Sequence, residues 1–325
     1  MKKAPVAVIG GGWSGERGIS LLSLRGVADG LRRRGWAVEA LDLLPDRGSP
    51  RPATPPFARP VRLGALLERL RRRPGTLAFL ALHGPGGEDG RIQGLLDLAG
   101  VPYTGSGLLA SALAMDKALA KTVLAAAGVP VPGGLHLRRG EAVPRVALPA
   151  VVKPVSQGSA LGVTIARTPA QLRAGLKAAW RLDEGALVEP YLRGRELTVG
   201  VLGARALPAV EILPQHEFYD FHSKYAAGGS RHLCPAPLAP ALEARARALA
   251  LKAHRALGCR AYSRTDMILG PGGGLRVLEV NTLPGLTSVS LLPDAARAAG
   301  LGYGELLEAM LQASLTEAAW PSTKA

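Results

Sequence analysis

The sequence predicts a protein of several domains, of mixed α/β and α+β class. Its 325 residues are more than one typical hydrophobic core accommodates, and two or three domains fit this length. Near the start, the apolar run 6–9 leads through glycines to apolar residues at helical spacing over 19–31, and a second apolar run follows at 38–41. A strand, a helix and a strand in this order indicate a parallel sheet.

The following segments complete the first part of the chain. Residues 77–82 are wholly apolar and predict a buried parallel strand that brings His83 to its carboxyl end, where parallel-sheet proteins hold their ligands. Residues 44–62 are rich in Pro and Arg and predict a surface insertion without chemistry. Residues 115–127 are rich in Ala and predict a helix, which the next Gly-Val-Pro ends.

Two further groups of elements are expected. Strands at 150–153, 163–166 and 186–189, with a helix near 171–181, predict a compact α+β middle unit. The last part is expected to hold a strand near 197–202, a long irregular loop over 214–237, a helix over 242–257 and a final hairpin. The sequence contains no internal repeat.

Composition limits the class of protein. A hydrophobic content of 47% with a charged content of 20% is typical of a folded globular chain. No stretch offers the ~20 uninterrupted apolar residues that a membrane span needs, and the run 6–9 is too short for a signal peptide. The two cysteines, Cys234 and Cys259, lack disulfide-framework and metal-ligand spacing, which fits a reducing compartment. We therefore expect a cytoplasmic protein without a membrane partner.

The net charge of +15 raises the question of nucleic-acid binding. The excess is mostly scattered arginine, and the local runs 32–34 and 71–73 lack interleaved aromatic residues that would stack on bases. We expect solvated helix ends at both runs and no nucleic-acid partner, with steering of an anionic small substrate as the alternative.

A predicted hairpin near the C-terminus brings polar side chains together. If it closes between the third and fourth residues of the turn 270–274, Asp266 lies opposite Glu279 and Arg264 lies opposite Asn281. All four side chains then share one face, because strand side chains repeat with period two. Two carboxylates and a carboxamide suit Mg²⁺, which usually brings the phosphates of a nucleotide as further ligands. The sequence therefore predicts an ATP-using enzyme; a solvated polar face of an edge hairpin is the alternative.

A small-residue loop follows the predicted strand at 150–153. It runs from Lys153 through Gly158 and Ser159 to Gly162, so backbone N–H groups can approach a phosphate closely while the lysine supplies a point charge. Its spacing is not that of a Walker loop, and an ordinary hairpin turn is the alternative.

Two other positions allow both a functional and a structural interpretation. The strand that carries Glu189 leads to Leu192, and this linker backbone could bind an adenine edge while Glu196 accepts ribose hydroxyls. His83 is followed by glycines that permit a close approach of the backbone to a ligand, but a histidine that caps a turn is equally a structural feature.

A dinucleotide-binding oxidoreductase is the rival class. Residues 10–15 satisfy G-x-G-x-x-G after a strand, and Asp42 ends the next strand, where an acid would bind ribose. Against this interpretation, Glu16 places a carboxylate in the first helical turn, where pyrophosphate would have to bind, and no acid/base pair for a nicotinamide follows.

Taken together, the motifs resemble those of the D-alanine–D-alanine ligases of the ATP-grasp superfamily. The matching segments cover nearly the whole chain in the order of the family: Ser14–Ser20, Ala81–Gly84 with Glu88–Gly90, Pro102–Gly107, Met115–Lys117, Lys153–Pro154 with Gly158–Ser159, Phe218–Asp220 with Lys224–Tyr225, Arg264–Asp266, and Leu278–Thr282 with Pro284–Gly285.

The resemblance implies a Rossmann-like N-terminal substrate domain over 1–108, followed by a two-domain ATP-grasp fold with a central subdomain over 109–192 and a C-terminal subdomain over 193–325. It implies that ATP phosphorylates the carboxylate of one D-alanine and that the amine of a second attacks the acylphosphate, giving a dipeptide for peptidoglycan. It further implies ATP and two Mg²⁺ or Mn²⁺ ions as cofactors, D-alanine as substrate, and a homodimer.

The resemblance also implies roles by motif position. ATP would be held by Lys117, Lys153, Glu189, Leu192, Glu196 and Lys224, and the metals by Asp266, Glu279 and Asn281. Glu16, Ser159 and Tyr225 would order the substrate site, which His83, Gly285, Ser290 and Leu291 would line. Arg264, on the face of the metal ligands, has a planar fork suited to the oxyanion and the transferring phosphoryl group. The loop from Phe218 to Cys234 would close as a lid and exclude water.

The chain departs from the family pattern at three places. Gly18 replaces an acid, Ala160 stands where a second serine is usual, and Pro190-Tyr191 is an unusual hinge, but none of these removes an expected catalytic group. Lys224-Tyr225 favours D-alanine as the acceptor, and ligases that use D-serine or D-lactate are the alternative within the superfamily.

Overall fold

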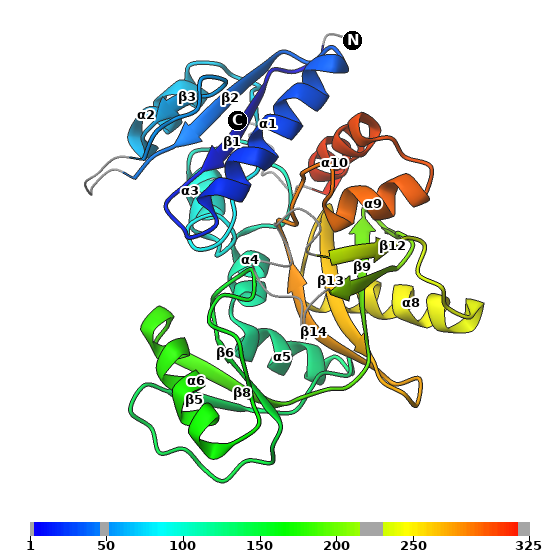
Figure 1. Ribbon diagram of the computed structural model, residues 1–325. Coiled ribbons are helices and arrows are strands. Elements are labelled where there is room, and N and C mark those ends of the chain that lie inside the picture. Colours follow the sequence, from blue (N-terminus) through cyan, green and yellow to red (C-terminus); the bar gives the residue numbers. More distant parts are fainter. Residues whose placement is uncertain (1–2, 46–51, 215–229, 318–325) are drawn as a thin grey trace.

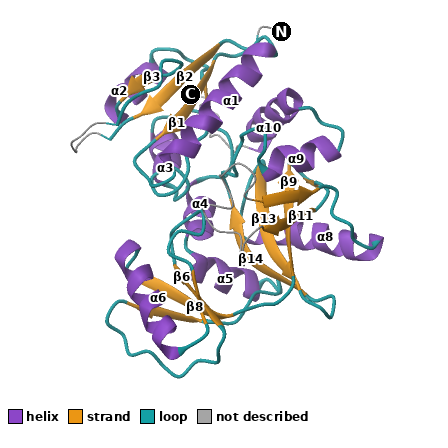
Figure 2. Ribbon diagram, viewed as in Figure 1, coloured by secondary structure: helices purple, strands orange, loops and turns teal. Residues whose placement is uncertain are grey.

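The computed structural model describes residues 3–45, 52–214 and 230–317. These residues form three sheets, which lie in separate parts of the sequence, with helices packed beside and between them (Figures 1 and 2). The mixed α/β multidomain class predicted from the sequence is confirmed. None of the helices in the described ranges is both long and apolar enough to cross a membrane.

The first sheet is four-stranded and parallel, with the order β3-β2-β1-β4. Its strands are β1 (Val6–Gly11), β2 (Val38–Leu43), β3 (Arg59–Val61) and β4 (Leu77–Leu80), and its helices are α1 (Arg17–Arg33), α2 (Leu63–Arg71) and α3 (Arg91–Leu98). Every residue of β1 and β4 is buried, as expected for parallel strands covered on both faces. The predicted strands at 6–9 and 38–41 and the helix over 19–31 are therefore confirmed.

The prediction that 44–62 is only a surface insertion was wrong at its C-terminal end. Residues 59–61 form β3, which extends the sheet beside β2, and Phe57 and Ala58 pack against the core. The Pro- and Arg-rich composition concealed this short edge strand. Proline is tolerated on an edge strand because only one side of the strand needs to form ladder hydrogen bonds.

The helix predicted over 115–127 is confirmed as α5 (Lys117–Ala126), and a further helix, α4 (Leu108–Met115), which was not predicted, precedes it. Asp116 separates them: its backbone is extended, and its side chain accepts hydrogen bonds from the N–H groups of Ala118 and Leu119 at 3.0 and 2.9 Å. This is an N-cap, which satisfies donors that the first turn of α5 leaves open. The break places Lys117 at the start of a new helix.

The second sheet is four-stranded and antiparallel, with the order β5-β8-β6-β7. It consists of β5 (Leu135–Arg138), β6 (Ala150–Pro154), β7 (Thr164–Ala166) and β8 (Gly185–Pro190), and α6 (Pro169–Leu182) packs on it. Thr168 and Gln171 form a capping box that starts α6. The three strands and the helix predicted here are confirmed, whereas β5 was missed because only one of its residues is buried.

The third sheet is six-stranded, with the order β12-β11-β9-β13-β14 and β10 paired to β9. Its strands are β9 (Arg195–Leu202), β10 (Arg205–Ala206), β11 (Val210–Pro214), β12 (Ser230–Leu233), β13 (Tyr262–Leu269) and β14 (Leu275–Asn281). The helices that the structure describes in this part of the chain are α8 (Pro240–Ala256), α9 (Leu291–Ala298) and α10 (Tyr303–Glu317). The strand at 197–202, the helix over 242–257 and the hairpin are confirmed. The predicted irregular loop over 214–237 contains β12, and its residues 215–229 lie outside the described part.

One hydrophobic cluster joins the first and third parts of the chain. Leu24 and Leu31 of α1 belong to the same cluster as Leu307 and Met310 of α10, and all four side chains are fully buried. The two helices lie side by side (Figure 1), and a Cβ on Gly30 would lie 2.7 Å from Leu307 Cδ1, so only glycine permits this approach. The C-terminal helices thus hold the first sheet in place beside the third.

Candidate functional site

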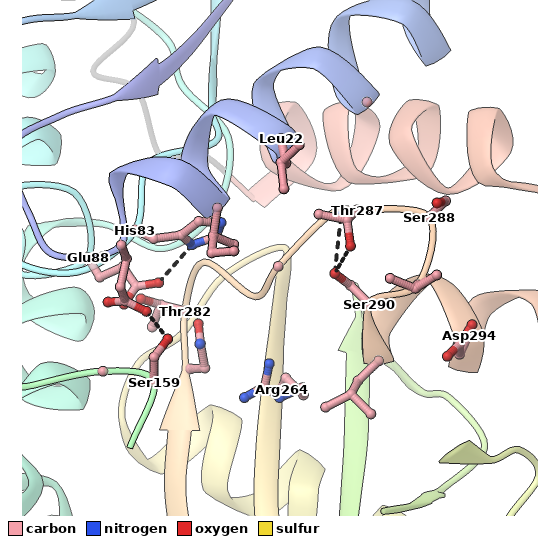
Figure 3. A pocket seen from close by; sticks show the side chains of 18 of the residues that line it. Leu22, His83, Glu88, Ser159, Arg264, Thr282, Thr287, Ser288, Ser290 and Asp294 are labelled. Atoms are coloured by element: carbon pink, nitrogen blue, oxygen red, sulfur yellow. Dashed lines mark hydrogen bonds and ion pairs between the residues drawn. The ribbon is translucent and has the colours of Figure 1, made fainter. Parts of the chain in front are cut away.

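A cavity of about 1040 Å³ lies where the three sheets approach one another. Figure 3 shows His83, Ser159 and Arg264 around one side of it and Thr287 and Ser290 on the other. Ten of the site residues predicted from the sequence line this cavity: Glu16, His83, Lys117, Ser159, Arg264, Glu279, Asn281, Gly285, Ser290 and Leu291.

The predicted register of the hairpin is confirmed where the site lies. Arg264 pairs with Asn281, and Asp266 pairs with Glu279. The register then shifts, because Met267 pairs with Val277, which leaves Leu278 as an extra residue on β14. The exact centre of the predicted turn was therefore wrong, while the alignment of the four polar side chains was right.

Both carboxylates of the hairpin have cationic partners. Arg264 donates to Asp266 from Nε to Oδ1 at 2.9 Å and from Nη2 to Oδ2 at 2.7 Å, a bidentate pair. The Thr198 hydroxyl also donates to Asp266 Oδ1, at 2.5 Å. Lys117 Nζ lies 3.4 Å from Glu279 Oε2. The guanidinium of Arg264 and the ammonium of Lys117 therefore balance the negative charge of the two carboxylates, in positions where bound metal ions could do the same.

The oxygen donors fit a hard divalent cation. Asp266 and Glu279 lie on neighbouring strands, and the Asn281 amide oxygen, which accepts the Leu283 N–H at 2.9 Å, completes the set. Among the described residues no group of three or more His, Cys, Asp or Glu side chains is arranged to hold a metal. A metal here would therefore rest on two carboxylates, one amide and ligands from a bound substrate.

Three lysines and Glu189 form a buried ionic cluster beside the cavity. Lys153 Nζ lies 2.9 Å from Glu189 Oε2, and Lys121 Nζ forms an ion pair with the other oxygen of the same carboxylate. Lys117 Nζ donates to the Gln157 carbonyl oxygen at 2.7 Å. Burial, assisted by the charge of Lys117, lowers the pKa of Lys153 to about 8, and burial together with the charge of Lys153 lowers the pKa of Lys121 to about 6.

Lys121 was missed by the sequence reasoning. It lies four residues after Lys117 on α5, and this spacing places both side chains on one face of the helix. Once the helix is known to begin at Lys117, the spacing becomes a usable signal.

Glu16 closes the cavity on the side of the first sheet. The Ser159 hydroxyl donates to Glu16 Oε1, which joins the loop after β6 to the N-terminus of α1. The carboxylate is buried between two glycines: a Cβ on Gly158 would lie 2.6 Å from Glu16 Oε2, and one on Gly84 would lie 2.7 Å from it. Two glycines are needed because the backbone approaches the carboxylate closely from both sides.

His83 is a buried residue of the cavity wall. Its Nδ1 lies 3.3 Å from Glu88 Oε1, and its Nε2 lies 3.1 Å from the Ser23 hydroxyl. The sequence placed His83 correctly on the carboxyl side of β4, although β4 ends at Leu80, three residues earlier than His83. The sequence did not identify Ser23, whose partner is sixty residues away in the chain.

The loop between β14 and α9 forms the opposite wall. The Ser290 hydroxyl lies 2.7 Å from the Thr287 hydroxyl and accepts the Thr287 N–H at 3.1 Å. Ser290 is the residue before α9, and Leu291 is its first residue. A Cβ on Gly285 would lie 3.0 Å from the Ser290 hydroxyl, so this loop is tightly folded.

The other predicted site residues that the structure describes are not among those that line the cavity. Lys153, Glu189 and Asp266 form the buried ion pairs described above, next to residues of the cavity wall. Leu192 follows β8, and Glu196 lies in β9 opposite Ile212 and Ile268. Lys224 and Tyr225 are outside the described residues, so their roles and that of the lid stay predictions.

The structure argues against the dinucleotide interpretation at Asp42. Arg17 binds this fully buried carboxylate with both amino groups, from Nη1 at 2.8 Å and Nη2 at 2.7 Å. A Cβ on Gly11 would lie 2.0 Å from Asp42 Oδ1, so the carboxylate fills the space beside the glycine turn. Asp42 is therefore engaged in an internal ion pair and does not face a ribose.

Comparisons with known proteins agree with this geometry. Models of the D-ala D-ala ligase N-terminus and C-terminus match residues 62–106 and 136–312. D-Alanine–D-alanine ligases of Citrifermentans bemidjiense and Azorhizobium caulinodans are 44% and 46% identical to this chain, over 97% and 94% of it and over 97% of each relative. The crystal structure of the Bacillus anthracis D-alanine–D-alanine ligase complexed with ATP has a TM-score of 0.79 at 30% identity, covering 97% of this chain and 98% of that one. The chain belongs to the D-alanine–D-alanine ligase family.

Proposed function

We propose that this protein joins two D-alanines in an ATP-dependent reaction through an acylphosphate. The observation that carries the proposal is the alignment of Asp266 with Glu279 and of Arg264 with Asn281 on one hairpin, beside a cavity that Glu16 and Ser159 close from the opposite side. Membership of the family supplies the substrate class, and the ATP complex of the Bacillus anthracis relative supports the nucleotide.

The reaction proceeds in two steps, a phosphoryl transfer and an attack by an amine. A carboxylate oxygen of the first D-alanine attacks the γ-phosphorus of ATP, the bond to the bridging oxygen breaks, and ADP leaves. The amine of the second D-alanine then attacks the carbonyl carbon and a carbon–nitrogen bond forms. The bond from this carbon to the bridging oxygen breaks, phosphate leaves with that oxygen, and the amine nitrogen loses a proton. Arg264, which Asp266 holds at the cavity wall, stabilises the oxyanion of the tetrahedral intermediate.

Lys117 and Lys153 bind the ATP phosphates in this proposal. Both ammonium groups now face carboxylates, Lys117 near Glu279 and Lys153 against Glu189, and the anionic triphosphate is a stronger partner for either cation. Glu189, Leu192 and Glu196 are assigned to the adenine and ribose, as the family motif implies, and Lys224 to the phosphates.

Asp266, Glu279 and Asn281 would hold two Mg²⁺ or Mn²⁺ ions. The ions would offset the repulsion between an anionic carboxylate and an anionic phosphate. The two carboxylates are already in register on adjacent strands, and in the protein without bound metal Arg264 and Lys117 neutralise their charge.

The substrate amino acids are assigned to the two walls of the cavity. The first D-alanine lies near Glu16, Ser159 and His83, and the second lies near Gly285, Ser290 and Leu291. Tyr225 is assigned to the ordered set with Glu16 and Ser159. We further propose a cytoplasmic location, a homodimer and a role in peptidoglycan precursor synthesis, all on the basis of the family.

The test of function is the release of phosphate from ATP in the presence of Mg²⁺ and D-alanine, with the dipeptide identified by mass spectrometry. Parallel reactions with D-serine and D-lactate as acceptors decide among ligases of this superfamily. Binding of NAD(H), followed by fluorescence, without any phosphate release that depends on D-alanine would instead favour the oxidoreductase.

A further inference from the structure

One peptide of the cavity wall is held from two sides. The Leu286 N–H donates to the Ser23 hydroxyl at 3.4 Å, and the Tyr303 hydroxyl donates to the Leu286 carbonyl oxygen at 2.6 Å. Ser23 lies on α1 and Tyr303 begins α10. Leu286 directly follows Gly285, so the two helices fix the orientation of the loop that carries the wall residues.

Ser23 also contacts His83, and the direction of these hydrogen bonds follows from the chemistry of the groups. Glu88 as a carboxylate only accepts, so His83 Nδ1 carries the proton and donates to it at 3.3 Å. His83 Nε2 then accepts the Ser23 O–H at 3.1 Å, while Ser23 accepts the N–H of Leu286. Ser23 has no exposed surface, so water cannot replace its hydroxyl without repacking.

The packing around the peptide is specific as well. Gly26 lies one turn after Ser23 on α1, and a Cβ there would lie 2.9 Å from the Tyr303 hydroxyl and 3.3 Å from the Leu286 carbonyl oxygen. Glycine at this position therefore allows α1 to approach the loop until both hydrogen bonds form.

We propose that Ser23 and Tyr303 are positioning residues for the acceptor amino acid. This inference rests on the proposed function. By fixing the Leu286 peptide, the two hydroxyls set the distance between Gly285 on one wall and His83 on the other, and hence between the two amino acids. A displacement of about 1 Å between reacting groups can lower a rate about a hundredfold, so a defined distance matters for catalysis.

The test compares Ser23→Ala and Tyr303→Phe with Ser20→Ala as a matched control. Ser20 lies on the same helix, is equally buried and makes two hydrogen bonds, accepting from Gly11 N–H at 2.8 Å and donating to the Ala81 carbonyl oxygen at 2.7 Å, neither of which reaches the loop. Phosphate release is measured against D-alanine at saturating ATP to obtain the KM of the acceptor. Binding of the first D-alanine is measured by calorimetry with a non-hydrolysable ATP analogue.

We expect Ser23→Ala and Tyr303→Phe to raise the acceptor KM about fivefold to tenfold, as the loss of one buried hydrogen bond implies, while the KM for ATP changes less than about twofold. In Tyr303→Phe, which leaves the hydrogen bond of His83 intact, the Kd of the first D-alanine should also change less than about twofold. Ser20→Ala should lower the Tm without changing the ratio of these constants. An unchanged acceptor KM in both loop variants, or an equal change of all three constants, would overturn the proposal.

The two variants are independent, so Tyr303→Phe decides the question if Ser23→Ala does not fold. The wild-type protein separates the two levels of inference. Without phosphate release that depends on D-alanine in the wild type, the proposed function itself fails; with it, only the behaviour of the variants bears on the positioning role.

Discussion

Gly158→Ala is the sharpest probe of the hydrogen bond that closes the cavity. Gly158 has an ordinary negative or extended φ, so alanine fits its backbone, but the new Cβ would lie 2.6 Å from Glu16 Oε2. An ordinary contact begins near 3.4 Å, so the carboxylate must retreat by about 0.8 Å. Gly84 approaches the same oxygen from the other side, so the carboxylate can only turn away from both glycines, and we expect it to lose the hydrogen bond from Ser159.

The size of the effect follows from that hydrogen bond. A hydrogen bond to a charged group contributes about 1.5–3 kcal/mol, which corresponds to a loss of about 10- to 150-fold in kcat/KM if the contact is needed in the transition state. The measurement is phosphate release with D-alanine, ATP and Mg²⁺, together with the Tm.

Gly18→Ala is the control for this experiment. Gly18 lies two residues after Glu16 on α1, and a Cβ there would meet no atom within 4 Å. Alanine should stabilise the helix by up to about 1 kcal/mol and leave turnover unchanged. If Gly158→Ala retained turnover within about twofold of the wild type, the hydrogen bond between Ser159 and Glu16 would have no part in catalysis.

Three further predictions concern the ionic groups. Glu279→Gln should raise the Mg²⁺ concentration for half-maximal turnover about tenfold or more, measured by metal titration, because one carboxylate ligand is lost; an unchanged metal dependence would contradict the assignment. Arg264→Ala should lower kcat at least about 100-fold with the ATP affinity nearly intact, because it removes an oxyanion donor and the cationic partner of Asp266; normal turnover would contradict its role. Burial lowers the pKa of Lys153 to about 8, so in the protein without ATP its ammonium group loses a proton as the pH rises past 8. The triphosphate favours the protonated form, so ATP binding near pH 9 should take up a proton in calorimetry with buffers of different ionisation enthalpy, and Lys153→Met should abolish that uptake. Equal uptake in the variant would point to another group.

The sequence was sufficient where one strong local signal decided the structure. The apolar runs at 6–9 and 77–82 contain the buried parallel strands β1 and β4, of which β4 ends at Leu80. The glycine-rich turn 270–274 fixed the hairpin closely enough to align Asp266 with Glu279. Motif order was enough to place most site residues on one cavity, because the family pattern spans nearly the whole chain.

The remaining features depended on tertiary contacts that no local pattern records. The prediction found α5 but not α4, and the capping hydrogen bonds by which Asp116 separates the two helices are visible only in the structure. The role of Ser23 depends on His83 and Leu286, both distant in sequence. Lys121 is significant because it forms an ion pair with Glu189, which lies on β8 of the second sheet. Its spacing from Lys117 alone would also fit a solvated helix face.

The extra residue Leu278 changes the parity of β14. Before it, the odd-numbered Val277 faces inward and belongs to the hydrophobic cluster of α4, α5 and α8; after it, the even-numbered Val280 does so, which frees Glu279 and Asn281 for the cavity. Val277 and Glu279 are two positions apart, yet one faces the hydrophobic cluster and the other faces the cavity. In a strand with unbroken alternation, side chains two positions apart would face the same side. Deleting residue 278 would force a choice between the two surroundings, so the hairpin owes its dual character to a single extra residue.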